Sequence, residues 1–406
     1  NIYSVVSPGT EKMLIQFGKQ SLIKKFIKNL DRVALVLRKI SEEGFVSTYN
    51  KVENKLNLPI ELGYSTCSIV ENTTSKLLKK GDVVVTNGSH GDYSFVKNNL
   101  CIKAPENLKK KDLSFSFLAS ISINAYKISK TKLDQKSAVI GLGIIGSILA
   151  SYIISENKSV TTFDTDKDKV EKFKNKYNSR YVQKDLKNIE SNFKNNFDVV
   201  YLCIENISTN LFYKSCELLK NNGLIVIVGT TKSYFPRDII YKKNLRIKVA
   251  VSYGPGRYDE KFEKGEDLNY IKNFEYSYVD NIKSFFKKIE KNKIDLSILS
   301  FSTFNFQSFK EAYKELIEKK TSGIIFDYLE TIQNISTSKI NKINKNLNLN
   351  NKVLCDIIGT GNHASNVIIP NLIKLKNVYI QNLVSKNNIS SNYINKKLNL
   401  NSNIEN

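Results

Sequence analysis

The chain of 406 residues has no tryptophan, two histidines and five cysteines. Because its only histidines are His90 and His363, it cannot build a metal site that is rich in histidine. The cysteines are scattered singly and form no Cys-x-x-Cys pair, which favours a reducing compartment, so we expect a cytoplasmic protein. No apolar run reaches the ~18 residues that span a membrane, so we predict no membrane partner.

Signatures of nucleic-acid-binding domains are also missing, although the formal net charge is +23. The basic residues are spread along the whole chain instead of forming one stripe, and bulk charge bears on solubility and non-specific binding. We therefore predict no nucleic-acid partner. The chain begins at Asn1 and ends in an Asn- and Lys-rich stretch, which we interpret as a fragment that lacks residues at both ends.

Strand and helix patterns change along the chain. Residues 60–105 contain short strands punctuated by Gly, Asn and Asp, which predicts a small antiparallel barrel or sandwich. A helix is predicted over 113–130, and apolar strands then alternate with helices, which predicts an α/β fold with a parallel, doubly wound sheet. Residues 331–352 have the composition of a linker. A second strand-turn-helix unit follows from residue 353.

Two glycine-rich turns follow apolar strands. They are Gly141-Leu142-Gly143-Ile144-Ile145-Gly146 and Gly359-Thr360-Gly361-Asn362-His363-Ala364. In such a turn the first glycine allows the tight bend, the second lets the backbone approach a pyrophosphate, and a small third residue lets the helix pack closely on the sheet. The helix N-terminus adds free N–H groups and a positive dipole. Each turn therefore predicts a dinucleotide site.

The residue at the end of the next strand helps to select the cofactor. Asp164 can accept hydrogen bonds from ribose hydroxyls and would repel a 2′-phosphate, which favours NAD over NADP for the first turn. We expect further cofactor contacts from the ends of later strands, at Ile204, Gly229 and Thr230. In the second unit Ser385 stands at the corresponding place, so that unit is open to NAD or NADP.

These features resemble the medium-chain dehydrogenase/reductase family over roughly residues 1–330. The matching segments are Gly81-Asp82-Val83-Val84, the strand-rich region around them, the first glycine turn, Asp164 and Gly323-Ile324-Ile325. The resemblance implies a Rossmann domain at 116–265 within a split GroES-like catalytic domain, formed by 1–115 without its first strands and by 266–330. It also implies a homodimer through edge strands, with 245–251 as the candidate edge.

The zinc motifs of that family are where the chain departs from it. Ser7 stands in the place of the first cysteine ligand, Gly63-Tyr64-Ser65 replaces a Gly-His-Glu motif, and Ser120 replaces a further cysteine. The four-cysteine loop of the structural zinc is absent as well. Zinc binds through Cys, His and carboxylate groups, so we predict that the chain uses no zinc.

Without zinc, side chains must polarise the substrate oxygen and move a proton. Tyr64 is the first choice as donor or acid, and Glu11 could orient it or act as a base. Ser7 and Ser120 stand at former ligand positions, and Asn124 falls where the family places a residue touching the nicotinamide. Alternatively, Tyr64 is a buried barrel aromatic, and Glu11 satisfies backbone N–H groups in the turn before it.

Two further polar residues have competing interpretations. His90, in a predicted hairpin turn, is more typical of a solvated turn residue than of a catalytic base. Arg257 lies among glycines, where it could bind an anionic group of the substrate, such as a phosphate or carboxylate, or hold its own loop by a salt bridge.

Three motifs give a narrower resemblance, to bacterial bi-domain oxidoreductases associated with surface-polysaccharide and sugar-modification pathways. They are Ser7-x-Gly-Thr-Glu11, Phe17-Gly18-Lys19-Gln20-Ser21-Leu22 and the segment 252–259. In such proteins a medium-chain dehydrogenase is fused to a glucose-fructose oxidoreductase/inositol dehydrogenase-like module. The resemblance implies that 353–406 is the truncated start of that second Rossmann domain, whose catalytic Lys-Pro region would lie beyond Asn406.

Together, the motifs and the resemblance predict a zinc-independent NAD(H)-linked oxidoreductase that transfers a hydride to or from a polyol, sugar or nucleotide-sugar. An NADPH-dependent quinone or alkene reductase is one alternative, which Asp164 argues against. A non-enzymatic nucleotide-sensing or scaffold module is the other.

Overall fold

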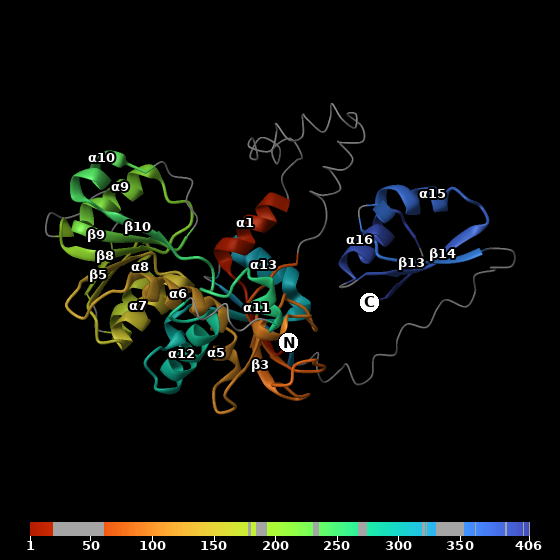
Figure 1. The fold of residues 1–406 in the computed structure, drawn as a ribbon, viewed down its shortest axis with the longest axis horizontal. Helices are drawn as coiled ribbons and strands as arrows, with labels where there is room; N and C mark the ends of the chain where they lie inside the picture. The colour runs from red at the N-terminus through yellow and green to blue at the C-terminus, as the bar shows by residue number, and fades with distance from the viewer. Residues whose placement is uncertain are drawn as a thin grey trace. The chain divides into compact units, whose positions relative to one another are not determined.

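The structure of the chain is a computed structural model. It describes residues 1–18, 61–177, 180–183, 193–229, 235–266, 274–318, 321, 323–329, 353–361, 363–385, 388–400 and 402–405. The chain divides into two compact units, and we describe each by itself (Figure 1). The first comprises Asn1–Glu11 and Leu62–Gln333, and the second comprises the remaining residues. Among the described residues, every helix is too short or too polar to cross a membrane.

The first unit contains a mixed six-stranded sheet in the order β11-β12-β1-β2-β3-β4. Its strands are β1 (Tyr3–Val5), β2 (Thr66–Ile69), β3 (Val83–Thr86), β4 (Cys101–Lys103), β11 (Ser302–Asn305) and β12 (Ile324–Asp327). In its centre, β1 pairs antiparallel with both β12 and β2, so that Tyr3 lies opposite Asp327 and Cys67. The sheet thus combines strands that precede the parallel sheet in sequence with strands that follow it. The domain boundaries expected at 115 and 265 stay predictions.

The second sheet of this unit is entirely parallel, in the order β10-β9-β8-β5-β6-β7. Its strands are β5 (Ser137–Ile140), β6 (Val160–Asp164), β7 (Arg180–Gln183), β8 (Phe197–Leu202), β9 (Leu219–Ile227) and β10 (Arg246–Val249). This is the strand order of a doubly wound dinucleotide-binding fold, with the switch between β5 and β8. The predicted fold class is confirmed, and β10 lies at an edge of the sheet, as predicted for 245–251.

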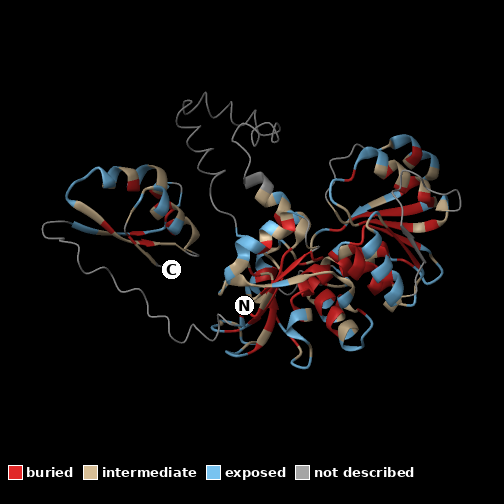
Figure 2. Cartoon of the chain, turned by 180° about the vertical axis from the view of Figure 1, so that it is seen from behind, coloured by how far each residue is buried: buried red, intermediate tan, exposed pale blue. Residues whose placement is uncertain are grey.

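Helices cover both faces of the parallel sheet (Figure 1). α9 (Thr209–Leu218) and α10 (Arg237–Lys243) pack on the face of Ala138 and Ile140. α7 (Ile144–Ser155) and α8 (Lys167–Tyr177) pack on the face of Val139. Because both faces are covered, β5 is buried along its whole length, and buried residues are seen along such strands (Figure 2).

The helix predicted over 113–130 corresponds to α6 (Ser116–Ser129), and a separate short helix, α5 (Lys110–Leu113), ends just before it. The hydroxyls of Ser114 and Ser116 donate to the carbonyls of Lys111 and Leu113, both over 2.6 Å. Such serine-to-backbone bonds compete with the helical ladder and favour an interruption at this point. α1 (Pro8–Gly18) begins in this unit, whose other α-helices are α11 (Glu260–Lys264), α12 (Tyr278–Glu290) and α13 (Phe309–Ile317).

The second unit contains a smaller parallel sheet in the order β13-β14-β15. Its strands are β13 (Val353–Ile358), β14 (Val378–Val384) and β15 (Asn403–Glu405), and its helices are a π-helical turn (Ala364–Ile368), α15 (Ile369–Ile373) and α16 (Ile389–Lys397). Strands and helices alternate, which matches the first half of a dinucleotide-binding fold. The linker predicted at 331–352 lies outside the described residues.

Candidate active site

The first glycine turn connects β5 to α7. Gly141 has a φ of +97°, and a Cβ there would lie 2.5 Å from Ile204 Cγ2. A Cβ at Gly146 would lie 1.8 Å from the carbonyl oxygen of Gly141. At Gly143, in contrast, a Cβ would meet no atom within 4 Å. Packing therefore requires the outer two glycines, whereas Gly143 leaves open space at the N-terminus of α7, where a pyrophosphate would approach.

Asp164 lies at the end of β6, beside this turn. Its Oδ2 accepts a hydrogen bond from the N–H of Leu142 over 2.6 Å, and its Oδ1 accepts one from the N–H of Asp166 over 2.8 Å. The carboxylate is thereby held in place by backbone groups, and it keeps further lone pairs for ribose hydroxyls. The turn and Asp164 together fit a dinucleotide.

The ends of the later strands pack together beneath the turn. A Cβ at Gly229 would lie 1.8 Å from the carbonyl oxygen of Ile204, so only glycine allows this approach. The side chain of Ile204 in turn lies against Gly141. Thr230, the other residue predicted here, lies outside the described residues.

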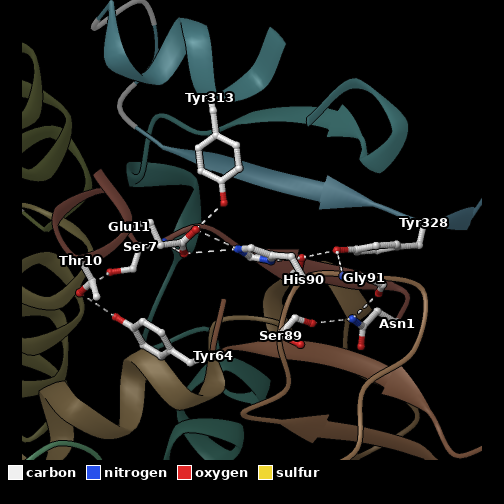
Figure 3. Close-up of polar contacts among 11 residues, drawn as sticks. Asn1, Ser7, Thr10, Glu11, Tyr64, Ser89, His90, Gly91, Tyr313 and Tyr328 are labelled. Atoms are coloured by element: carbon white, nitrogen blue, oxygen red, sulfur yellow. Dashed lines mark hydrogen bonds and ion pairs between the residues drawn. The ribbon is translucent and has the colours of Figure 1, made fainter. Parts of the chain in front are cut away.

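Tyr64 belongs to a cluster of hydroxyl groups. Its OH lies 3.4 Å from Thr10 Oγ1, and Ser7 Oγ lies 3.5 Å from the same atom (Figure 3). Burial is the largest cause that raises the pKa of Tyr64 above its ordinary value. The hydroxyl therefore stays protonated at neutral pH and can act as a hydrogen-bond donor.

This cluster adjoins the carboxyl-terminal edge of the parallel sheet. A Cβ on Gly9, next to Thr10 in α1, would lie 3.6 Å from Glu205 Oε2, which follows β8. Ligands of doubly wound sheets bind outside the carboxyl ends of the strands, near the topological switch point. The structure thus brings Ser7, Thr10 and Tyr64 to the edge of the sheet where a dinucleotide would lie.

Glu11 is 1% exposed, and its carboxylate faces donors other than Tyr64. It accepts hydrogen bonds from the N–H of Ser7 over 2.9 Å and from Tyr313 OH over 2.5 Å, and His90 Nε2 lies 3.1 Å away (Figure 3). The contact with Ser7 matches the alternative in which Glu11 satisfies a backbone N–H group. Its predicted role as a base stays a prediction.

His90 does not lie in solvent, so the interpretation as a solvated turn residue is wrong. Its side chain is 4% exposed, with Nδ1 2.7 Å from Ser4 Oγ. A residue remote in sequence holds the turn that carries His90. The Asn1 side-chain amide donates to the carbonyls of Ser89 and Gly91 (Figure 3). These partners are remote in sequence, which is why a local turn pattern could not show the burial.

Ser120 and Asn124 are buried and hold the loop after β10. Ser120 Oγ donates to the carbonyl of Tyr253 over 2.9 Å. Asn124 Nδ2 donates to the carbonyl of Val251 over 3.3 Å, and its Oδ1 accepts from Tyr276 OH. The structure connects them to the site through Tyr253, whose ring lies beside that of Tyr64. Their predicted contact with substrate or nicotinamide stays a prediction.

Arg257 forms an ion pair with Glu263, which is 2% exposed. Glu263 also accepts from the N–H of Tyr258 and from Lys97 Nζ. This is the geometry expected of an arginine that holds its loop. Among the described residues, Arg257 Nε is buried without a partner, so an anion-binding role stays a prediction.

Sequence reasoning missed the members of the polar network behind Glu11, namely Ser4, Tyr313 and Tyr328. Ser4 Oγ lies 2.8 Å from Tyr328 OH, which links β1 to the end of β12. Tyr313 occupies one position of an amphipathic helix, and that pattern says only that it faces the interior. The sequence contains no local signal that pairs these residues.

The second glycine turn is also open. Gly359 has a φ of +93°, and a Cβ at either Gly359 or Gly361 would meet no atom within 4 Å. Ala364 is buried at the start of the following helix. Ser385, at the end of β14, accepts a hydrogen bond from Ser391 Oγ over 2.8 Å. The predicted cofactor contacts of this unit stay predictions.

The residues at the expected zinc positions do not fit that metal. Ser7, Tyr64 and Ser120 offer hydroxyl groups, whereas zinc binds through Cys, His and carboxylate groups. In the part of the chain that the structure describes, no three or more His, Cys, Asp and Glu side chains are grouped to hold a metal ion. Independence from zinc stays a prediction, and we derive no step through zinc.

Comparison with known proteins supports the fold. Residues 136–244 match the family described as the NAD binding domain of 6-phosphogluconate dehydrogenase. A search of curated protein sequences finds no match.

Three solved structures illustrate the likeness of the first unit. Galactitol-1-phosphate dehydrogenase from Escherichia coli has a TM-score of 0.54 and 14% identity, over 66% of this chain and 84% of that chain. S. aureus TarJ in complex with NADPH has a TM-score of 0.54 and 14% identity, over 68% and 84%. Acetophenone reductase from Geotrichum candidum in complex with NAD has a TM-score of 0.50 and 12% identity, over 69% and 85%. The first unit therefore has the fold of these dehydrogenases and reductases.

Proposed function

We propose that the first unit is an NAD(H)-linked oxidoreductase that transfers a hydride to or from a polyol, sugar or nucleotide-sugar. The observation that carries the proposal is the position of the hydroxyl cluster of Ser7, Thr10 and Tyr64. The cluster lies at the carboxyl edge of the parallel sheet, because Gly9, the residue before Thr10, lies close to Glu205, which follows β8. A role in surface-polysaccharide or sugar-modification metabolism rests on the motif resemblance alone.

The nucleotide half supplies the cofactor site. The open space at Gly143 and the N-terminus of α7 would take the pyrophosphate, and Asp164 would take the ribose hydroxyls. A 2′-phosphate would meet the negative charge of Asp164, which supports NAD. When bound, the nicotinamide accepts or supplies the hydride.

Tyr64 supplies the proton in the direction of reduction. Its neutral hydroxyl donates a hydrogen bond to the substrate carbonyl oxygen and passes its proton to that oxygen as the carbon receives the hydride. Thr10 Oγ1 lies 3.4 Å away and returns a proton to the tyrosine oxygen while it takes one from Ser7 Oγ at 3.5 Å, which solvent reprotonates. Because burial raises the pKa of Tyr64, the donating form persists at neutral pH.

The test is Tyr64→Phe, compared with Tyr93→Phe as a matched control, since Tyr93 is 60% exposed. Reduced nicotinamide is followed by absorbance with a panel of polyols, sugars, nucleotide-sugars and the matching ketones. We expect Tyr64→Phe to lower kcat by about 10²–10⁴-fold with unchanged NADH affinity. Absence of turnover across the panel would contradict the proposal. Turnover of quinones with NADPH would favour the alkene or quinone reductase instead.

We also propose a second dinucleotide site in the second unit, at Gly359 and Gly361, for NAD or NADP. The left-handed Gly359 and the strand order of the unit support it. In a protein whose first site is disabled by Gly143→Val, calorimetry should detect residual nucleotide binding that Gly361→Val removes. Fusion to a glucose-fructose oxidoreductase-like module remains a proposal from the sequence motifs.

A homodimer through β10 completes the proposal. β10 is an edge strand, and Val249 in it is 61% exposed. Light scattering should give the mass of a dimer, and Val249→Lys should give that of a monomer.

A further inference from the structure

His90 contacts both of the segments that build the hydroxyl cluster of Tyr64. One segment is the first turn of α1, which carries Ser7 and Thr10. The other is the segment before β2, which carries Tyr64 itself. The two come from distant parts of the chain. The N–H of Val5 donates to the carbonyl of Ser65 over 3.0 Å, which joins the segments at their base. Beyond that bond, the Thr10 and Tyr64 hydroxyls lie 3.4 Å apart, a long contact that does not fix their separation by itself.

On the side of α1, the contact of His90 is with Glu11. His90 Nε2 lies 3.1 Å from Oε2 and 3.3 Å from Oε1 of Glu11 (Figure 3). Glu11 Oε1 accepts the N–H of Ser7 over 2.9 Å, which closes the first turn of the helix. A carboxylate that is 1% exposed is costly unless donors surround it, so removal of one donor loosens the turn that it holds.

On the side of Tyr64, the contacts of His90 are with Leu62 and Gly63. The N–H of His90 donates to the carbonyl of Leu62 over 2.7 Å. A Cβ at Gly63 would lie 2.7 Å from the backbone N of His90 and 2.8 Å from its ring. Gly63 therefore rests directly on the imidazole, and Tyr64 is the next residue along the chain.

The hydrogen bonds behind the ring fix its orientation. The N–H of Gly91 donates to Tyr328 OH over 3.2 Å, and Tyr328 OH lies 2.8 Å from Ser4 Oγ. Ser4 Oγ in turn lies 2.7 Å from His90 Nδ1, while His90 Nε2 faces the Glu11 carboxylate at 3.1 Å. Both ring nitrogens are thus occupied, which makes His90 a positioning residue that does not touch the substrate.

We infer that His90 sets the distance between the Thr10 and Tyr64 hydroxyls, through Glu11 on one side and Gly63 on the other. The inference rests on the proposed function of Tyr64. It assigns His90 to the reaction although the residue is buried behind the site.

Two amide variants test the contacts of the two ring nitrogens of His90 separately. His90→Gln places an amide N–H near the position of Nε2 and keeps a donor to Glu11. His90→Asn places an amide near the position of Nδ1 and keeps the contact with Ser4 alone. We expect His90→Asn to lower kcat at least tenfold at unchanged NADH affinity and substrate KM, and His90→Gln to restore most of the loss. Amide hydrogen exchange of residues 7–11 should rise in His90→Asn and stay near the wild-type rate in His90→Gln.

The other outcomes overturn the inference. Equal kcat and equal exchange in His90→Asn and the wild type would exclude a positioning role. Faster exchange with unchanged kcat would show that the first turn of α1 does not matter to catalysis. If the wild type binds NADH but turns over nothing in the panel, the proposed function fails, and the exchange of residues 7–11 still decides whether His90 holds the helix.

If His90→Asn fails to fold, Tyr313→Phe tests the same role of the Glu11 carboxylate through a different hydrogen-bond donor. It removes another donor to Glu11 and leaves Gly63 untouched. We expect faster exchange in residues 7–11, unchanged exchange in residues 62–65 and a lower kcat. Unchanged exchange in residues 7–11 would contradict the role assigned to the Glu11 contacts.

Discussion

The backbone N–H of Leu142 donates a hydrogen bond to the Asp164 carboxylate over 2.6 Å. This bond connects the middle of the glycine turn to the end of the neighbouring strand. The residue expected to choose between NAD and NADP therefore also shapes the turn expected to bind the pyrophosphate. Substitutions at Asp164 should accordingly change both affinity and preference.

The two effects can be separated with Asp164→Ala and Asp164→Asn. Alanine removes the acceptor for Leu142 and for the ribose, so we expect NAD to bind about 10–100-fold more weakly, from the ~1.5–3 kcal/mol of a hydrogen bond to a charged group. Asparagine keeps an acceptor without the charge, so NADP affinity should rise relative to NAD. Calorimetric titration of both nucleotides measures this, and an unchanged preference in Asp164→Asn would contradict the assignment.

Gly143 and Gly146 should respond in opposite ways to a side chain. Gly143→Val should abolish NAD binding at an unchanged melting temperature, because a Cβ there meets no protein atom within 4 Å. Gly146→Ala should instead destabilise the fold, because its Cβ would lie 1.8 Å from the carbonyl oxygen of Gly141. Thermal unfolding and NADH fluorescence distinguish the two. Retained affinity in Gly143→Val would rule out the cofactor site.

Arg257→Ala should act mainly on stability. Glu263 is 2% exposed and would lose its ion-pair partner, while Lys97 remains. Loss of one partner from a buried pair costs about 3–5 kcal/mol. We expect the lower end, because the Arg257 side chain is 22% exposed. Urea unfolding measures the change, and a rise in KM confined to phosphorylated substrates, without destabilisation, would instead indicate the anion-binding role.

Buried tyrosines should make the protein sensitive to alkaline pH. Burial raises the pKa of Tyr201 to about 12, whereas an unfolded tyrosine ionises near pH 10. Below pH 10 the group is neutral in both states. Between pH 10 and 12 only the unfolded chain releases the proton, so the free energy of unfolding falls by about 1.4 kcal/mol per pH unit. Tyr201→Phe should flatten this fall, and Tyr93→Phe should not. Equal slopes in the two variants would contradict the prediction.

The nucleotide half could be predicted because its signals are local. Gly141, Gly146 and Asp164 lie within one strand-turn-helix-strand unit, whose spacing can be recognised in a short window of sequence. The same locality explains why β10 and the strands of the second unit were found. The break between α5 and α6 at residue 114 was not predicted, because serine hydroxyls, and not hydrophobic periodicity, favour it.

The catalytic half was predicted less well because its contacts are long-range. The Thr10 hydroxyl lies within 3.5 Å of both Ser7 Oγ and Tyr64 OH, whereas the catalytic roles of Ser7 and Tyr64 stay predictions. The surroundings of His90 come from β1, from α1 and from residues near 313 and 328, so no window of sequence contains them. Burial of a polar turn residue depends on partners that only the tertiary fold supplies.

The pairing of β1 with β12 also has a consequence for synthesis. Ser4 and Tyr328 bond across 324 positions of sequence, which a ribosome needs roughly 15–65 seconds to translate. By the end of that interval all six strands of the parallel sheet have been synthesised, whereas β1 still lacks its pairing with β12. The nucleotide half should therefore fold first on the ribosome, and the half that carries Tyr64 should close around it last.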